Sequence, residues 1–155
     1  MDKNLDIDNI DLKIISLLND DAKTPYTEIA KKVFVSSGTV HVRMRKLEEM
    51  GIVKSATLNI DFSKLGYDIS AFLGIYLEKS SLYDNVIEKL KAISEVINAY
   101  YTTGNYSIFA KIICKDTNHL RTVLDNIQKV EGIDRTETLI VLEESINRPI
   151  QFFDK

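Results

Sequence analysis

The sequence predicts an α+β protein in which an N-terminal winged helix-turn-helix is followed by a ferredoxin-like βαββαβ domain. Three helical patterns at short spacing come first, and the last of them is basic. From Ile69 onward the pattern changes to strands and helices in the order βαββαβ, which is typical of a four-stranded antiparallel sheet with both helices on one face. We therefore expect a head over 1–58, a linker over 59–68 and a second domain over 69–155.

The first two helices of the head each have a start signal and an apolar face. Asp8 or Asn9 can cap the first helix. Its inward residues are Ile10, Ile14, Ile15, Leu17 and Leu18. Thr24 followed by Pro25 suits the N-cap and first turn of the second helix. Its inward residues are Ile29, Ala30 and Val33. Only residues 34–35 then precede the next helix start, and so short a connection predicts a helix-turn-helix.

Residues 36–54, SSGTVHVRMRKLEEMGIVK, combine a helix start, an apolar inner face and a basic outer face. Ser36 can cap this helix, and Gly51 suits the left-handed residue that ends it. The inward residues are Val40, Met44 and Leu47, with Met50 at the edge. The outer face, with Arg43 on its flank, fits a DNA major groove, although an ordinary amphipathic surface helix shares the pattern. The candidate DNA contacts are Ser37, Gly38, Thr39, His41, Val42, Arg43, Arg45 and Lys46.

Residues 52–53 and 56–58, which include the β-branched Ile52, Val53 and Thr57, predict a small wing. Charge supports a DNA-binding head, because it is segregated within a chain of net charge −3. Residues 1–21 carry six Asp against two Lys, a balance of −4, and residues 22–54 carry five Lys and two Arg against three Glu, a balance of +4. A net acidic protomer implies weak binding per head, so we expect several heads to act together.

Several protein classes are disfavoured by composition. A single cysteine, Cys114, excludes an internal disulfide framework and fits a reducing cytoplasm. The aspartate-rich start is unlike a signal peptide, and no apolar run approaches the length of a membrane span. His41 and His119 lack metal-ligand spacing, and no glycine-rich phosphate loop occurs. We therefore expect a cytoplasmic protein that is not an enzyme and needs no metal or cofactor.

The elements expected in the second domain are a strand over 70–77, a helix over 83–93, strands over 96–103 and 106–114, a helix that starts at Asp116 or Thr117 and ends at Gly132, and a strand over 135–143. The two central strands are expected to meet in a two-residue turn at Gly104-Asn105.

Both faces of the predicted sheet are apolar. One strand alternates Ala71, Leu73, Ile75 and Leu77 with Phe72, Gly74 and Tyr76, and another alternates Ile108, Ala110 and Ile112 with Phe109 and Ile113. The chain's own helices cover one face only, so the other predicts a two-fold homodimer. An exposed aromatic sheet can instead stack RNA bases, but residues 106–109 lack the Lys/Arg-Gly-aromatic pattern of such modules.

The whole chain resembles the Lrp/AsnC family of prokaryotic transcriptional regulators. Residues 10–11, 29–31 and 40–43 carry the head pattern of that family. Blocks at 37–43, 65–68, 100–109 and 136–142 are similar to its asparagine-responsive branch. The resemblance implies a sequence-specific regulator that binds double-stranded DNA, senses free L-asparagine as its effector, and assembles from homodimers into octamers.

A free amino acid needs hydrogen-bond partners for its ammonium and carboxylate groups. The hairpin around Gly104-Asn105 places several such partners close together. Neighbouring elements or another subunit can add further partners. The candidate effector residues are Tyr101, Thr102, Thr103, Gly104, Asn105, Tyr106, Ser107, Gln128, Thr136 and Thr138. Composition alone also allows a plain turn with strand-forming threonines. Another amino acid such as glutamine, or a nucleoid-organising protein without a ligand, stays open.

Two positions depart from the common family pattern. Many relatives have an aspartate where Ser107 stands, so the hydroxyl here removes a charge that can meet the ammonium group of a bound amino acid. The family often has glycine in the turn where Phe34 stands. If that position needs positive φ, phenylalanine costs about 1–2 kcal/mol there.

Overall fold

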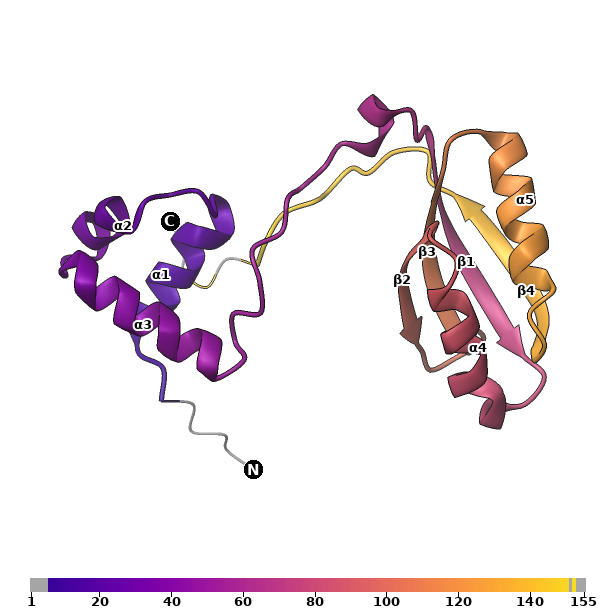
Figure 1. The fold of residues 1–155 in the computed structure, drawn as a ribbon, viewed down its shortest axis with the longest axis horizontal. Helices are drawn as coiled ribbons and strands as arrows, with labels where there is room; N and C mark the ends of the chain where they lie inside the picture. The colour runs from indigo at the N-terminus through magenta and orange to yellow at the C-terminus, as the bar shows by residue number, and fades with distance from the viewer. Residues whose placement is uncertain (1–5, 151, 153–155) are drawn as a thin grey trace. The chain divides into compact units, whose positions relative to one another are not determined.

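The computed structural model describes residues 6–150 and 152 of the 155-residue chain (Figure 1). The chain divides into two compact units. Of the described residues, the first unit contains 6–59 together with 146–150 and 152, and the second is Ile60–Ser145. Residues 60–68, expected as a linker, group with the sheet, and residues 146–150 and 152 group with the head.

Three helices form the head: α1 (Asn9–Asp20), α2 (Tyr26–Val33) and α3 (Ser37–Glu49). The predicted inward faces of α2 and α3 are confirmed, since their members are buried together with Ile14 of α1. The buried apolar residues of this core are Ile14, Ile29, Ala30, Val33, Val40, Met44 and Leu47. Burial of these side chains is the main stabilisation of helices this short, which are marginal on their own.

The helix ends follow the sequence signals closely. Asp8 caps α1, and Ser36 caps α3 by accepting the backbone N–H of Thr39. Gly51 follows α3 with a φ of 70°, as predicted for a left-handed residue. The prediction for α2 was wrong by one residue. Pro25, not Thr24, stands at the N-cap, because its carbonyl accepts the N–H groups of Glu28 and Ile29, and no side chain caps this helix.

Phe34 forms the turn between α2 and α3 in the left-handed conformation, at φ 58° and ψ 45°. Its side chain is 93% exposed, so it gains little from packing. A β-carbon in this conformation costs about 1–2 kcal/mol. The turn therefore adopts the left-handed conformation at the expense of local strain.

Replacing Phe34 by glycine should raise the free energy of unfolding by about 0.5–1 kcal/mol, because the relief of strain exceeds the entropy that glycine adds to the unfolded chain. Urea unfolding measures this change. Phe34→Ala is the matched control, since alanine also removes the ring but keeps the β-carbon. Equal stabilisation by both substitutions would contradict the strain argument.

Residues 53–61 have no regular secondary structure. The two short wing strands expected at 52–53 and 56–58 are therefore absent from this structure. The β-branched residues there lack the partner strand that a wing requires.

The second unit contains β1 (Ile69–Leu77), α4 (Tyr83–Lys91), β2 (Val96–Tyr101), β3 (Ile108–Cys114), α5 (Thr117–Gln128) and β4 (Ile133–Ile140), with short 3-10 helices at Phe62–Leu65 and Ser80–Leu82. The strand order is β2-β3-β1-β4 with antiparallel neighbours, which confirms the ferredoxin-like fold. Leu73 and Ile75 of β1 share one core with Val86 of α4 and Ile127 of α5. Both helices thus cover the same face of the sheet.

The connection between β2 and β3 is longer than predicted. Tyr101 pairs with Ile108, which leaves residues 102–107 as a six-residue loop. Thr102 closes the loop from within, since its N–H donates to the Ser107 carbonyl and its hydroxyl donates to the Tyr106 carbonyl at 2.8 Å. The N–H of Ser107 donates to Ile75 of β1 at 2.9 Å. The predicted two-residue turn is therefore wrong, because the strand pairing ends at Tyr101 and Ile108. Ser107 bonds to Thr102 through its carbonyl and to Ile75 of β1 through its N–H.

Candidate DNA and effector sites

The outer face of α3 is exposed along most of its length. Val42 is 71% exposed, and Gly38, His41 and Arg45 are exposed beside it. The Arg45 guanidinium makes no hydrogen bond or ion pair with any residue that the structure describes. Ser37 and Thr39 lie half-buried at the start of the helix, where the Thr39 hydroxyl is 2.8 Å from that of Ser36.

Tyr26, at the start of α2, belongs beside this face although sequence reasoning did not select it. Its ring meets His41 edge-on, with centroids 4.6 Å apart. A surface pocket beside the two rings is lined by Tyr26, His41, Val42, Met44, Arg45 and Glu48. The position of Tyr26 outside α3 explains the omission, because only the folded contact between α2 and α3 brings the two rings together.

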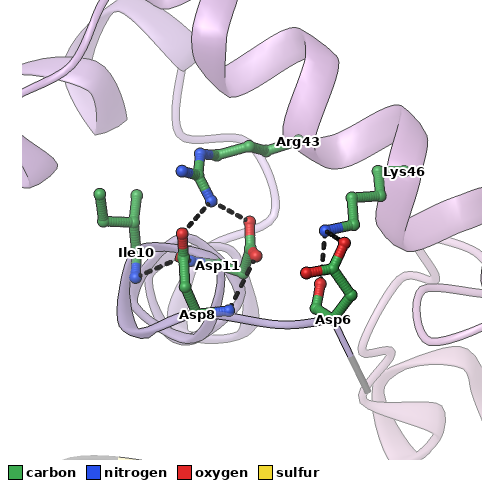
Figure 2. A network of polar contacts seen from close by, with 6 residues as sticks. All are labelled: Asp6, Asp8, Ile10, Asp11, Arg43 and Lys46. Atoms are coloured by element: carbon green, nitrogen blue, oxygen red, sulfur yellow. Dashed lines mark hydrogen bonds and ion pairs between the residues drawn. The ribbon is translucent and has the colours of Figure 1, made fainter. Parts of the chain in front are cut away.

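Arg43 and Lys46 differ from Arg45, because acidic residues at the start of α1 hold them (Figure 2). Arg43 Nη1 lies 2.8 Å from Asp8 Oδ2 and 2.7 Å from Asp11 Oδ1. Lys46 Nζ lies 2.9 Å from Asp6 Oδ2 and also donates to the Asp6 carbonyl. Hydrogen bonds from Arg43 to Asp11 and Asp8 raise the pKa of the guanidinium, which stays charged. The cationic candidates for DNA contact thus fall into two groups: Arg43 and Lys46 are paired with carboxylates of the same unit, and Arg45 is not.

The candidate effector residues lie in two groups on either side of β1. The loop 102–107 reaches β1 through the bond from Ser107 to Ile75. On the other side, Thr136 of β4 pairs with the same Ile75, and Gln128 Nε2 donates to the Thr136 hydroxyl at 3.1 Å. Thr138 lies opposite Leu73, farther along β4. Tyr101 belongs to neither group, because its ring packs against Tyr83 of α4 with ring centroids 4.4 Å apart.

Tyr106 anchors the loop to the sheet face that the helices leave uncovered. Its hydroxyl donates to Glu137 Oε2 at 2.8 Å, while Tyr76 donates to Glu137 Oε1 at 3.0 Å. These bonds lower the pKa of Glu137, that from Tyr106 most, and the Glu137 carboxylate raises the pKa of Tyr106. The ring of Tyr106 lies against Gly74, where a β-carbon would come within 2.4 Å of it. Sequence reasoning missed both Glu137 and the constraint on Gly74.

That uncovered surface, which we call the open sheet face, carries a row of aromatic and apolar side chains. Phe72 stacks on Phe109 with centroids 5.4 Å apart, and Tyr106 lies 5.8 Å from Phe109. The strand register places the remaining members on the same face. The aromatic and apolar members of the open sheet face, with one glycine, are Phe72, Gly74, Tyr76, Tyr100, Tyr106, Phe109 and Leu139. The same register places the charged residues Lys111, Arg135 and Glu137 beside them.

The histidine and the cysteine of the second unit, which could in principle serve catalysis or metal binding, have structural roles. His119 accepts the N–H of Lys115 at Nδ1 and pairs with Glu95 through Nε2 at 3.1 Å. Cys114 is buried, and desolvation raises the pKa of its thiol. Within the described residues no cluster of His, Cys, Asp and Glu is arranged to hold a metal ion. Among the helices of the same residues, none has the length and apolar character needed to cross a membrane.

Two family models match the chain: the Lrp/AsnC ligand binding domain over residues 70–150 and a winged helix-turn-helix DNA-binding domain over residues 7–54. The chain is 47% identical over 146 residues to Regulatory protein AsnC of Haemophilus influenzae, covering 94% of this chain and 97% of that protein. Its identity to Regulatory protein AsnC of Escherichia coli K12 is 44%, with 94% and 96% covered. The solved structure of E. coli AsnC matches with a TM-score of 0.88 at 43% identity, covering 94% of this chain and 98% of that chain.

Proposed function

The chain belongs to the Lrp/AsnC family of DNA-binding transcriptional regulators, and from this premise we propose that it senses free L-asparagine and works as an assembly of homodimers in the cytoplasm. It is a regulator with an amino-acid-binding domain and not an enzyme. Its similarity to proteins named AsnC over nearly the whole chain is the observation that carries the choice of asparagine.

The head is proposed to place α3 in the major groove. Gly38, Thr39 and Val42 then lie near base edges, while His41 and Arg45 reach bases or phosphates, with Ser37 at the start of the helix. The exposure of this face and the unpaired Arg45 support the placement. An α-helix in the major groove reads sequence through such side chains, and cations on its flanks neutralise phosphates.

The effector is proposed to bind at an interface built around the loop 102–107. The hydroxyl of Ser107 forms no hydrogen bond with the described residues, so it is available to a ligand. Thr136 and Gln128 lie across β1 from the loop and present further polar groups. The loop is exposed at Thr103 and Asn105, which fits a site completed by a second subunit.

Ser107→Ala should weaken asparagine binding by about 1 kcal/mol or more, since the ligand loses a hydrogen-bond partner. Titration calorimetry measures this loss directly. Ser81→Ala, in the 3-10 helix before α4, is the control and should leave the affinity unchanged.

The same titrations distinguish the alternatives. Leucine should bind far more weakly than asparagine, because it leaves the partners of the side-chain amide unpaired. Heat from leucine or glutamine with none from asparagine would assign another effector. Absence of heat from all the common amino acids would favour a DNA-organising protein without a ligand.

The open sheet face is proposed to pair with that of a second copy, and the dimers to associate further into octamers. Tyr100 and Leu139 are 57% and 49% exposed in the single chain, and such apolar patches mark interfaces. Light scattering at micromolar concentration should find an octamer. A stable monomer would contradict the pairing, and a stable dimer would contradict only the higher assembly.

A further inference from the structure

The bridge from Arg43 to α1 is unlike an ordinary surface ion pair. One nitrogen, Nη1, contacts both Asp8 and Asp11, residues that lie 35 and 32 positions away in the sequence. The Asp11 side chain is 1% exposed, and that of Arg43 is 24% exposed. The bridge therefore joins the flank of α3 to the interior of the head.

Both carboxylates are already fixed by the backbone of α1. Asp8 Oδ1 accepts the N–H groups of Ile10 and Asp11, which leaves Oδ2 for Arg43. Asp11 Oδ2 accepts the N–H of Asp8, which leaves Oδ1 for Arg43. Each oxygen thus has its own partner, and the two acceptors stand ready at a fixed place.

Release of Arg43 would leave a buried carboxylate without its counter-charge, which is costly in a protein interior. The pair between Lys46 and Asp6 has no such penalty, because its side chains are 38% and 94% exposed. DNA phosphates can therefore compete with Asp6 for Lys46 far more readily than with Asp11 for Arg43.

We propose that Arg43 is a positioning residue, which sets the orientation of α3 on α1 and does not itself contact DNA. This inference rests on the proposed placement of α3 in the major groove and revises the expectation that Arg43 is a DNA contact. A reading helix must be held within a fraction of an ångström to align its side chains with base edges. The buried bridge supplies this alignment.

The first test compares two substitutions that each remove one negative charge near α3. The DNA is a duplex that the wild-type protein enriches from a random-sequence pool, with a scrambled duplex of the same composition beside it. Asp6→Asn should strengthen binding to both duplexes, since a repulsive charge is lost. Asp11→Asn should weaken binding to the enriched duplex about tenfold, the equivalent of a lost base contact. Stronger binding by Asp11→Asn would overturn the proposal, because it would mean that Asp11 withholds Arg43 from DNA.

The second test uses Arg43 itself and holds even if Asp11→Asn fails to fold, which thermal unfolding reveals. Arg43→Gln should lose specific binding while the dependence of log K on log salt keeps its slope. Arg43→Lys should retain most of the binding, because a single nitrogen makes both contacts in the bridge. A slope reduced by about 0.9 in Arg43→Gln would show a direct phosphate contact and overturn the proposal. Equal losses in the lysine and glutamine variants would also overturn it, because a cation that can restore the bridge would then not restore binding.

Failure of the underlying placement gives a different result. If α3 does not enter the groove, Arg45→Ala binds the enriched duplex like the wild type, whatever the Arg43 variants do. That result refutes the positioning role together with the placement. If Arg45→Ala weakens binding to the enriched duplex as expected but Arg43→Gln binds it like the wild type, only the positioning role is refuted.

Discussion

Gly74→Val should reduce asparagine affinity at least tenfold, about 1.4 kcal/mol, although Gly74 lies on β1 and outside the loop. Its new β-carbon would come within 2.4 Å of the Tyr106 ring, so the ring must leave the sheet. Tyr106 then loses its bond to Glu137, and the end of the loop 102–107 loses its anchor. Overpacking of this kind should also lower the free energy of unfolding by about 1–3 kcal/mol. Calorimetry and urea unfolding measure the two effects.

Tyr106→Ala provides the control for this result. With the ring removed, the valine side chain has room, so Gly74→Val should add little to Tyr106→Ala in a double-mutant cycle. Valine is a good strand former, and a loss of strand propensity is thus excluded as the cause. Wild-type asparagine affinity in Gly74→Val, or additive losses in the cycle, would contradict the anchoring role of Tyr106.

Arg45→Ala should weaken binding to the enriched DNA by about 1–3 kcal/mol if the guanidinium reads a base. If it contacts a phosphate instead, binding to all sequences falls and the salt slope drops by about 0.9. Fluorescence anisotropy over a range of salt concentrations separates the two cases. Lys13→Ala removes an exposed cation from α1 of the same unit and serves as the control. Unchanged affinity in Arg45→Ala at physiological salt would exclude α3 as the reading helix.

Most of the fold follows from local patterns in the sequence. The spacing of Val40, Met44 and Leu47 sets the buried side of α3, because helical periodicity depends only on nearby residues. The order of strands and helices likewise predicted the sheet. The loop 102–107 was mispredicted because its geometry also depends on contacts beyond the turn, among them the bond from Ser107 to Ile75, which is distant in sequence.

Sequence patterns select candidate site residues, but they do not reveal the contacts that these residues make. Periodicity placed Arg43 on the flank of α3, but it cannot reveal a bond to Asp11, whose place depends on the packing of α1. Gly74 did carry a usable signal, since an isolated glycine inside a strand indicates a close approach by another group. Only the structure shows that this group is the ring of Tyr106.

The shared use of Asp8 and Asp11 has a consequence for how the head opens. Each carboxylate holds the first turn of α1 with one oxygen and α3 with the other. Fraying of α1 and detachment of α3 are therefore one event, and amide hydrogens in both places should exchange with the same free energy of opening. A signal that reaches the head then displaces or releases α1 and α3 together, instead of loosening the DNA-facing helix on its own.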